Sequence, residues 1–515
     1  MDLTTSTTLL YASLISGLFL AIIFIFLSSH KRLKRNNNPP CPSPTFPVIG
    51  HLHLLNGLPH RTLHQLSQKL GPVFSLQLGN QLAVIISSPS AVEECFTKND
   101  AVLANRPFFI SGKYFGYNHT TVINAPYGDH WRNLRRLMTV EIMSTSRINS
   151  FLSIRQDEVK YLLQGLYQVS SSTFAHVDMR SRLSELSFNV IMRMVAGKRY
   201  FGQGELSDYE EAKEFRNIVR EVFEKSDVLH PNEFLTILRL FDYGNYEKNL
   251  AKLQKKMDVF FQRLIDQRRL SNECNSMIDH LLVLQEKQPN YYTDEIIKGI
   301  ILVMILAGTD TSSVTLEWAL SLLVNHPEVL MKATTEIDSL IGQDRLVDEP
   351  DLAKLPYLQG VISDTLRLFP AAPLLLPHMP SEDCKIAGFD VPRGTMLIVN
   401  AWAINRDPNV WEEAEKFKPE RFEGKKDEKI PKIISFGLGR RACPGEGLAQ
   451  RIMGLTLASL IQSFQWERVS ENGLVDLTEG IGLTMPKAQP LEVMCKARHI
   501  LHKLFLMSCP HSYVY

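Results

Sequence analysis

One ten-residue stretch near the C-terminus constrains this chain more than any other. From Phe436 to Gly445 the sequence reads FGLGRRACPG, and it leads into an apolar helical run that starts at Leu448. The stretch holds one cysteine, Cys443, after a pair of arginines and before a Pro-Gly turn. Cationic neighbours and the amides of a helix start favour the thiolate form of a cysteine, and glycines let a backbone approach a flat ligand closely. We therefore interpret Cys443 as a candidate thiolate.

A lone thiolate restricts the metal chemistry that this loop can support. No His or Cys stands at zinc spacing around Cys443, which argues against structural zinc. A single thiolate is instead suited to axial ligation of haem iron. The alternative is a surface turn rich in glycine and proline that holds a buried, inert cysteine.

The bulk composition excludes some partners and indicates a compartment. The 515 residues carry 56 Lys and Arg against 55 Asp and Glu, so no overall positive field recruits nucleic acid. The seven cysteines are scattered and form no CxxC pair. This usage is typical of a reducing compartment, where thiols stay free.

The N-terminus predicts a membrane anchor over residues 1–30. Leu9 to Leu27 is apolar and uncharged, about the length that a helix needs to cross a bilayer. Four basic residues follow between Lys31 and Arg35, so the positive-inside rule places the remaining chain in the cytosol. A cleaved signal peptide is the alternative, but its positive charges precede the apolar run. Residues 31–50 then form a basic and proline-rich linker.

A long helix is predicted from a cap at Thr293 to Asn325, followed by Pro327. It is apolar from Ile300 to Leu306 and is then interrupted by the polar run AGTDTS over residues 307–312. We interpret it as a buried helix, too short and too polar to span a bilayer, with a functional break at this run. A hydroxyl at Thr311 beside the carboxylate of Asp310 suits proton delivery to bound oxygen. Ordinary back-bonding of Thr and Ser within a helix is the alternative.

The loop residues Phe436, Gly439, Arg441, Cys443 and Gly445 stand as they do in the haem loop of the cytochrome P-450 superfamily of haem-thiolate monooxygenases. The resemblance covers roughly residues 40–498, and the chain is most similar to plant microsomal members such as isoflavone hydroxylases. It implies a mainly α fold with a smaller β region, one catalytic domain over residues 51–498, and haem b between the long helix and the cysteine loop. Residues 499–515 form a tail without an assigned role.

The resemblance also implies roles for individual residues. Iron would be bound by Cys443, and oxygen activation would fall to Asp310 and Thr311. Haem contacts would come from Trp131, Arg135, His378, Phe436, Arg441 and Gly445. The substrate cavity would be lined by Phe108, Ile305, Ala307, Gly308, Ala372, Leu374 and Leu483, with Gly308 opening a groove beside Thr311.

A structural triad of Asp364, Arg367 and Arg421 is implied as well. The family normally has glutamate at the position of Asp364, and aspartate is one methylene shorter. We therefore expect the pair with Arg367 to be strained or bridged by water, and we expect Asp364→Glu to raise haem occupancy or thermal stability.

The function implied is hydroxylation of a small lipophilic plant metabolite, flavonoid-like or terpenoid, with O2 and NADPH. Electrons would come from a membrane-bound flavoprotein, the NADPH-cytochrome reductase, at the endoplasmic reticulum membrane. A basic docking face would include Arg132, Arg136, Lys416, Lys418 and Arg440. One alternative is a haem-thiolate isomerase or dehydratase, although the Asp310-Thr311 pair counts against it. Another is a non-catalytic haem-binding protein tethered to the membrane.

Overall fold

The computed structural model describes residues 37–202, 230–271, 275–423, 432–470 and 473–506, with residues 13, 16, 17, 211, 213, 215, 217–219, 221 and 222. The chain forms two compact units that alternate along the sequence. The first unit comprises residues 1–110, 228–249 and 374–403, and the second comprises the remainder. Nearly all of the predicted anchor and its basic flank lies outside the described residues.

The first unit is built on a three-stranded sheet. Strands β1 (Val73–Leu78) and β2 (Gln81–Ile86) form a hairpin across Gly79 and Asn80, and β6 (Met396–Val399) lies parallel to β2. Gly79 has a φ of +54°, which favours glycine in the tight turn.

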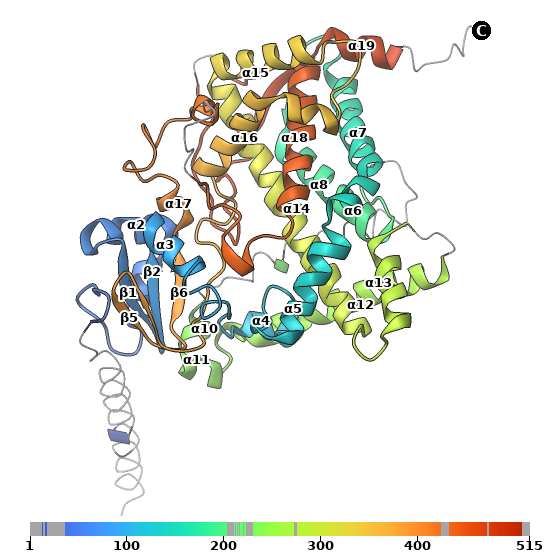
Figure 1. Ribbon diagram of the computed structural model, residues 1–515. Helices are drawn as coiled ribbons and strands as arrows, with labels where there is room; N and C mark the ends of the chain where they lie inside the picture. Colours follow the sequence, from blue (N-terminus) through green and yellow to red (C-terminus); the bar gives the residue numbers. More distant parts are fainter. Residues whose placement is uncertain are drawn as a thin grey trace, which may run out of the picture. The chain divides into compact units, whose positions relative to one another are not determined.

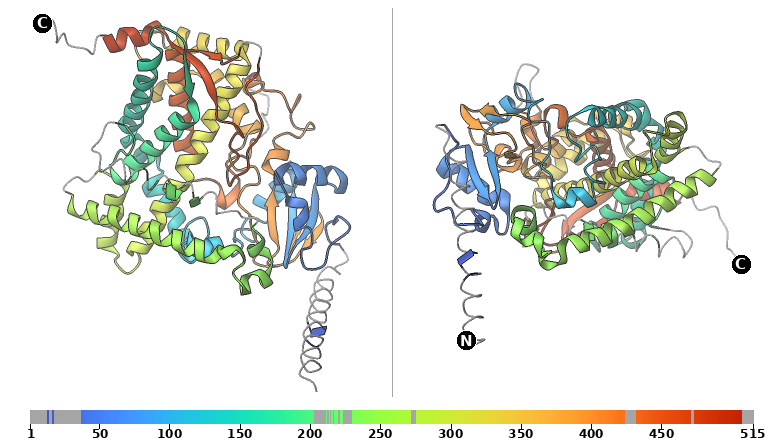
Figure 2. Two further views of the ribbon diagram at one scale, coloured as in Figure 1. Left: turned by 180° about the vertical axis from the view of Figure 1, so that it is seen from behind. Right: turned by 90° about the horizontal axis from the view of Figure 1, so that it is seen from below.

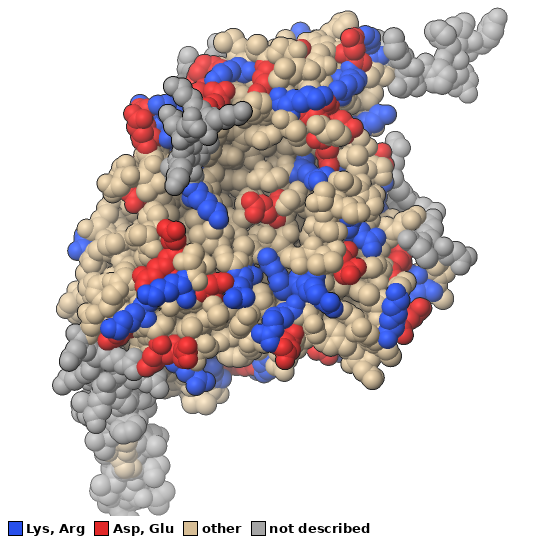
Figure 3. All heavy atoms as spheres, viewed as in Figure 1, with Lys and Arg blue, Asp and Glu red and all other residues tan. Residues whose placement is uncertain are grey.

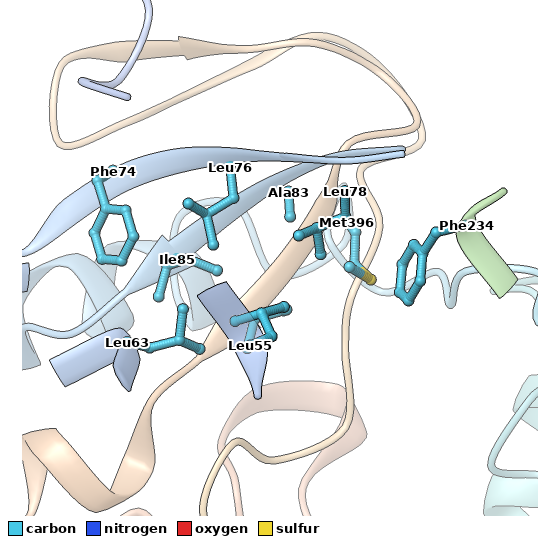
Figure 4. Close-up of a cluster of buried hydrophobic side chains, with 10 residues drawn as sticks. Leu55, Leu63, Phe74, Leu76, Leu78, Ala83, Ile85, Phe234 and Met396 are labelled. Atoms are coloured by element: carbon cyan, nitrogen blue, oxygen red, sulfur yellow. The ribbon is translucent and has the colours of Figure 1, made fainter. Parts of the chain in front are cut away.

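Alternate residues of these strands project from one face of the sheet and form the core of the unit, as Figure 4 shows. They pack against Leu55 and Leu63 from the adjoining helices and against Phe234. The other elements of this unit are η1 (Leu52–Leu55), α2 (Pro59–Leu70), α3 (Pro89–Phe96), α10 (Pro231–Phe234), α11 (Thr236–Leu240), η3 (Tyr243–Asn245), β4 (Cys384–Ile386), β5 (Phe389–Val391) and α17 (Ala401–Ile404).

The second unit is mainly helical, as the sequence predicts. Its elements are α5 (Asp129–Arg136), η2 (Leu137–Ile142), α6 (Thr145–Ser150), α7 (Leu152–Ser170), β3 (Ala175–Asp178), α8 (Met179–Ala196), α13 (Met277–Lys287), α14 (Asp294–Asn325), α15 (Pro327–Leu340), η4 (Glu349–Lys354), α16 (Pro356–Leu368), η5 (Pro419–Phe422), η6 (Gly439–Arg441), α18 (Glu446–Ser463), β7 (Phe464–Arg468), β8 (Glu492–Ala497) and α19 (His499–Leu506). It also holds most of α4 (Ile110–Tyr114) and α12 (Tyr246–Leu270).

Helix α14 runs through the middle of this unit, with α8, α16 and α18 packed against it (Figures 1 and 2). The Thr293 hydroxyl accepts a hydrogen bond from the backbone N–H of Ile296 and caps the helix, as predicted. Within the described part of the chain, α14 has the length and hydropathy of a membrane-spanning helix. The prediction that it is too short and too polar to span a bilayer is therefore wrong. Because 72% of its most apolar window is buried inside the protein, it is a core helix.

The predicted break in α14 does not occur. The helix is continuous through residues 307–312. The hydroxyls of Thr309 and Thr311 donate to the carbonyls of Ile305 and Ala307, four residues earlier. Each hydroxyl is hydrogen-bonded within the helix and leaves the backbone hydrogen bonds of the helix intact, as is usual for back-bonding side chains.

A second sheet, in the order β3-β8-β7, closes the far end of the second unit. Strand β3 was not predicted, because its alternation of apolar and polar residues, AHVD, spans only four positions and is too short to indicate a strand. The chain after β8 continues as α19, in which Ile500 and Leu501 are fully buried. The first part of the predicted tail is therefore a docked helix, and residues 507–515 lie outside the described residues.

Candidate functional site

The cysteine loop of the second unit closes on itself just before a helix. Gly437 and Gly439 have φ values of +71° and +68°, a region that favours glycine. The backbone N–H of Cys443 donates to the carbonyl of Phe436 at 2.8 Å, which brings the two ends of the loop together. Helix α18 begins at Glu446, so the thiol lies at its N-terminus.

Burial raises the pKa of the Cys443 thiol, while the backbone N–H groups of Gly445 and Glu446 and the Arg135 guanidinium oppose this rise. The expectation that neighbouring cations lower the pKa of Cys443 is therefore wrong for the protein alone, because the effect of burial is larger than the effect of the cations. Cys443 nevertheless keeps accessible surface, so a ligand can reach the sulfur. A metal cation bound to the sulfur would deprotonate the thiol outright.

Three side chains that were predicted to contact haem gather beside this loop. The Arg135 guanidinium donates to the Ala442 carbonyl at 2.6 Å. Trp131 Nε1 and Arg441 Nη1 both donate to the Val122 carbonyl at 3.0 Å. The Arg441 guanidinium lies 4.3 Å from the centroid of the Trp131 ring.

This arrangement suits a cofactor that carries carboxylates and supplies its own metal ligands. Burial and the charge of Arg135 lower the pKa of Arg441 to about 10, and a bound anion would relieve both effects. Among the described residues, no group of three or more His, Cys, Asp or Glu could hold a metal ion. A metal on Cys443 must therefore take its other ligands from a cofactor, and a porphyrin with two propionates meets both requirements.

His378 lies in the first unit. Its Nδ1 donates to the Leu103 carbonyl at 2.8 Å, and its ring packs against Phe96 with centroids 4.8 Å apart. The side chain is buried. A contact between His378 and a propionate stays a prediction.

The two candidate residues for oxygen activation have different partners. Thr311 Oγ1 donates to the Ala307 carbonyl at 2.6 Å, which is the back-bonding considered as the alternative, and its lone pairs remain able to accept a proton. Asp310 Oδ2 instead accepts a hydrogen bond from Thr484 Oγ1 at 2.5 Å. Burial raises the pKa of Asp310, and the Thr484 hydrogen bond and the charge of Arg180 counteract this.

The turn that carries the predicted cavity residue Leu483 lies against the segment next to Ala372 and against α14. The Met485 N–H donates to the Ala371 carbonyl at 2.9 Å, next to Ala372. Trp318 Nε1 of α14 donates to the Met485 carbonyl at 2.8 Å. These bonds hold the turn that carries the partly exposed Leu483 against α14 and the segment at residue 371.

The other predicted cavity residues lie in different surroundings. Ala307 is exposed on α14, whereas Ile305 is fully buried in the core. A Cβ atom at Gly308 would lie 2.7 Å from Ile191 Cδ1, so the lack of a side chain at Gly308 makes room for Ile191 of α8. Phe108 and Leu374 belong to the first unit, where Phe108 is exposed and Leu374 packs against the core.

The triad of α16 is fully formed. Arg367 Nε donates to Asp364 Oδ1 at 2.5 Å, and Arg421 Nε lies 3.1 Å from the same oxygen. The second carboxylate oxygen accepts from the Lys418 N–H at 2.6 Å. Arg367 and Asp364 expose no surface. The expectation of a water-bridged pair is therefore wrong, because the two side chains are in direct contact.

The short side chain of Asp364 fits a site where the backbone around η5 lies close to α16. Gly360 lies one turn before Asp364 on α16, and a Cβ atom there would lie 2.8 Å from the Pro419 carbonyl oxygen. The backbone around η5 therefore approaches α16 closely, and aspartate spans the short gap without water.

We now expect Asp364→Glu to lower stability rather than raise it. The extra methylene has no room in a site without exposed surface, and overpacking of this kind costs about 1–3 kcal/mol. Thermal unfolding measures the effect. Asp338→Glu is the matched control, because Asp338 pairs with Arg498 and its side chain is 28% exposed. An Asp364→Glu protein that melts above the wild type would contradict this prediction.

The predicted basic docking face is largely neutralised by neighbours. Arg132 pairs with Asp129, and Lys416 and Lys418 both pair with Glu413. Lys and Arg side chains nevertheless gather over α5 in Figure 3, where Arg136 is exposed. A reductase-docking role for the exposed face of α5 stays a prediction.

The family model described as cytochrome P-450 matches residues 39–491. The chain is 59% identical to cytochrome P-450 81Q32 of Catharanthus roseus, over 97% of this chain and 99% of that protein. It is 53% identical to the isoflavone 3′-hydroxylase of Medicago truncatula, over 95% and 98%. It is also 53% identical to the (+)-piperitol/(+)-sesamin synthase of Sesamum radiatum, over 96% and 98%.

Among solved structures, a zebra fish cytochrome P-450 with abiraterone is similar, with a TM-score of 0.73 and 26% identity. The similarity covers 86% of this chain and 99% of that one.

Proposed function

This chain belongs to the cytochrome P-450 family, and from that premise we propose that it hydroxylates a small phenolic metabolite of the flavonoid or isoflavonoid kind. As a member of that family it is a haem-thiolate monooxygenase that uses O2 and electrons from a reductase. The substrate class is supported by relatives named as isoflavone 2′- and 3′-hydroxylases. Terpenoids are the second class to test.

The observation that carries this function is the gathering of Trp131, Arg135 and Arg441 beside the loop of Cys443, which is the most accessible thiol among the cysteines that the structure describes. Cys443 would hold the haem iron, and these three donors would bind the propionates. The haem supplies the activation of oxygen when it is bound. Thr311 and Asp310 of α14 then hold and move protons. The apolar residues around them exclude water from the reaction.

The alternatives differ in what they consume. A monooxygenase consumes NADPH and O2 in proportion to product, whereas an isomerase or dehydratase consumes neither and a non-catalytic protein forms no product. The test feeds a panel of flavonoids, lignans and terpenoids to microsomes that contain the full chain and a reductase. Product formed without use of NADPH and O2 would contradict the proposal.

Thr311→Ala should uncouple electron use from product, because the hydroxyl that moves the proton is lost. General acid–base groups typically contribute at least ~100-fold, so we expect product per NADPH to fall by about tenfold or more as electrons leave in hydrogen peroxide. Peroxide and product are measured together. Thr309→Ala is the matched control, since this buried hydroxyl makes the same back-bond on roughly the opposite face of α14. Equal coupling in the two variants would contradict the role of Thr311.

We also propose that the protein is anchored in the endoplasmic reticulum membrane. The uncharged run from Leu9 to Leu27 and the basic residues after it support a single-pass anchor in the endoplasmic reticulum membrane with a cytosolic catalytic domain. An NADPH-cytochrome reductase in the same membrane would supply electrons to haem b. Deletion of residues 1–30 should move the protein from the microsomal to the soluble fraction, and an unchanged distribution would count against this anchor as the sole attachment.

A further inference from the structure

A hydrogen bond joins α14 to a turn that lies 174 positions later in the chain. Thr484 Oγ1 donates to Asp310 Oδ2 at 2.5 Å. Thr484 is buried. Within the described part of the chain, no other donor to the Asp310 carboxylate is seen. One hydroxyl therefore fixes the orientation of this acid.

The turn is held in place without this hydroxyl. Glu479 and Lys487 form an antiparallel bridge at its base, and the Gly480 N–H donates to the Pro486 carbonyl at 2.7 Å. The Met485 backbone is tied to Ala371 and to the Trp318 indole. Loss of the Thr484 hydroxyl should therefore leave the backbone of the turn where it is.

The charged groups around Asp310 are engaged elsewhere. Arg180 of α8 binds both carboxylate oxygens of Glu317, at 3.0 and 3.1 Å, and donates to the Lys487 carbonyl. The Lys487 ammonium donates to the Asp476 carbonyl and lies 5.0 Å from the centroid of the Trp318 ring. Arg180 acts on Asp310 through its charge and not through a hydrogen bond.

We propose that Thr484 is a positioning residue for the oxygen reaction, which acts by orienting the Asp310 carboxylate on α14. This inference rests on the proposed monooxygenase function and deepens it. Leu483 is partly exposed and adjoins Thr484 on the same turn. A substrate that contacts Leu483 therefore lies next to the hydroxyl that orients the acid.

A hydrogen bond to the ionised form of a carboxylate lowers its pKa. Burial already raises the pKa of Asp310, and the Thr484 hydrogen bond is the main effect that opposes this rise. Without the hydroxyl, the pKa of Asp310 should rise further. The acid limb of a pH profile that reflects ionisation of Asp310 should then move to higher pH.

The test compares Thr484→Val, which keeps the shape and removes the donor, with Thr484→Ser, which keeps the donor. Both are made in the full-length haem-loaded protein with its reductase, on whichever panel compound is turned over. We expect Thr484→Val to keep its haem content and its affinity for that compound while product per NADPH falls by about three- to tenfold, in line with loss of a hydrogen bond to a charged group. The acid limb of coupling should shift to higher pH, and Thr484→Ser should restore both values to within about twofold.

Infrared difference spectroscopy reads the carboxyl group directly and does not depend on turnover. Thr484→Val should show a protonated carboxyl band that persists to higher pH than in the wild type and is absent from Thr484→Val/Asp310→Asn. A Thr484→Val protein with wild-type coupling and no such band would overturn the proposal. So would a Thr484→Ser protein as uncoupled as Thr484→Val, since the retained hydroxyl would then not be enough to keep the reaction coupled. A wild type that consumes no NADPH with O2 would refute the proposed function, while the infrared result would still report on the Thr484 hydrogen bond.

Discussion

Cys443→Ala is expected to yield a protein that retains little or no haem and forms no oxygen-dependent product. The described part of the chain offers no cluster of His, Cys, Asp or Glu that could take over the metal, and Trp131, Arg135 and Arg441 would contact only the periphery of the cofactor in the proposed role. The haem-to-protein ratio after purification measures the first effect. Product formation with reductase, NADPH and O2 measures the second.

Cys384→Ala is the control for this experiment. Cys384 is another free cysteine, partly buried on β4, and its loss should leave haem content unchanged. A Cys443→Ala protein with full haem content and wild-type activity would contradict the role assigned to Cys443.

Arg367→Ala is expected to have the largest effect on stability. Arg367 is fully buried and donates to Asp364 and to the carbonyls of Asn405, Ala414 and Lys416. Its removal leaves the Asp364 charge and three carbonyl groups without this donor. Breaking a buried ion pair from one side costs about 3–5 kcal/mol, which is a large share of the stability of a folded protein. We expect little soluble haem-loaded protein, and a much lower melting temperature for any that is recovered.

Arg367→Lys tests whether charge alone is enough. A lysine ammonium cannot reproduce the planar fork that reaches four acceptors, so this variant should also be strongly destabilised. Arg132→Ala is the control, because Arg132 pairs with Asp129 and the two side chains are 52% and 93% exposed, and exposed pairs contribute at most about 1 kcal/mol. Equal melting temperatures for Arg367→Lys and the wild type would show that the hydrogen bonds of the fork are not needed.

Local signals account for the parts of the fold that the sequence predicted well. The Thr293 cap, the proline after α14 and the Gly79-Asn80 turn each act within a few residues, so their consequences can be inferred without knowledge of the fold. The cysteine loop is likewise a local arrangement of glycines and a helix start. The signal of strand β3 is too weak, since its alternating pattern spans only four residues.

Long-range contacts account for what could not be predicted. Ile191 determines the environment of Gly308, and Thr484 determines that of Asp310, but neither partner is near in sequence. The pKa of Cys443 also depends on long-range contacts. The adjacent arginines suggested a lowered pKa, whereas the burial that raises it arises from the packing of the whole unit. The close approach of η5 to α16 that accommodates Asp364 is also a tertiary effect.

The ligation of haem iron by the Cys443 sulfur is tested most directly by the absorption spectrum of the purified full-length protein, reduced and saturated with carbon monoxide. A thiolate ligand predicts the red-shifted Soret band of a haem-thiolate protein, in an amount equal to the haem content. A folded protein that shows the unshifted band of a haem without a thiolate, or that binds no haem, would contradict the assignment of Cys443 as the iron ligand.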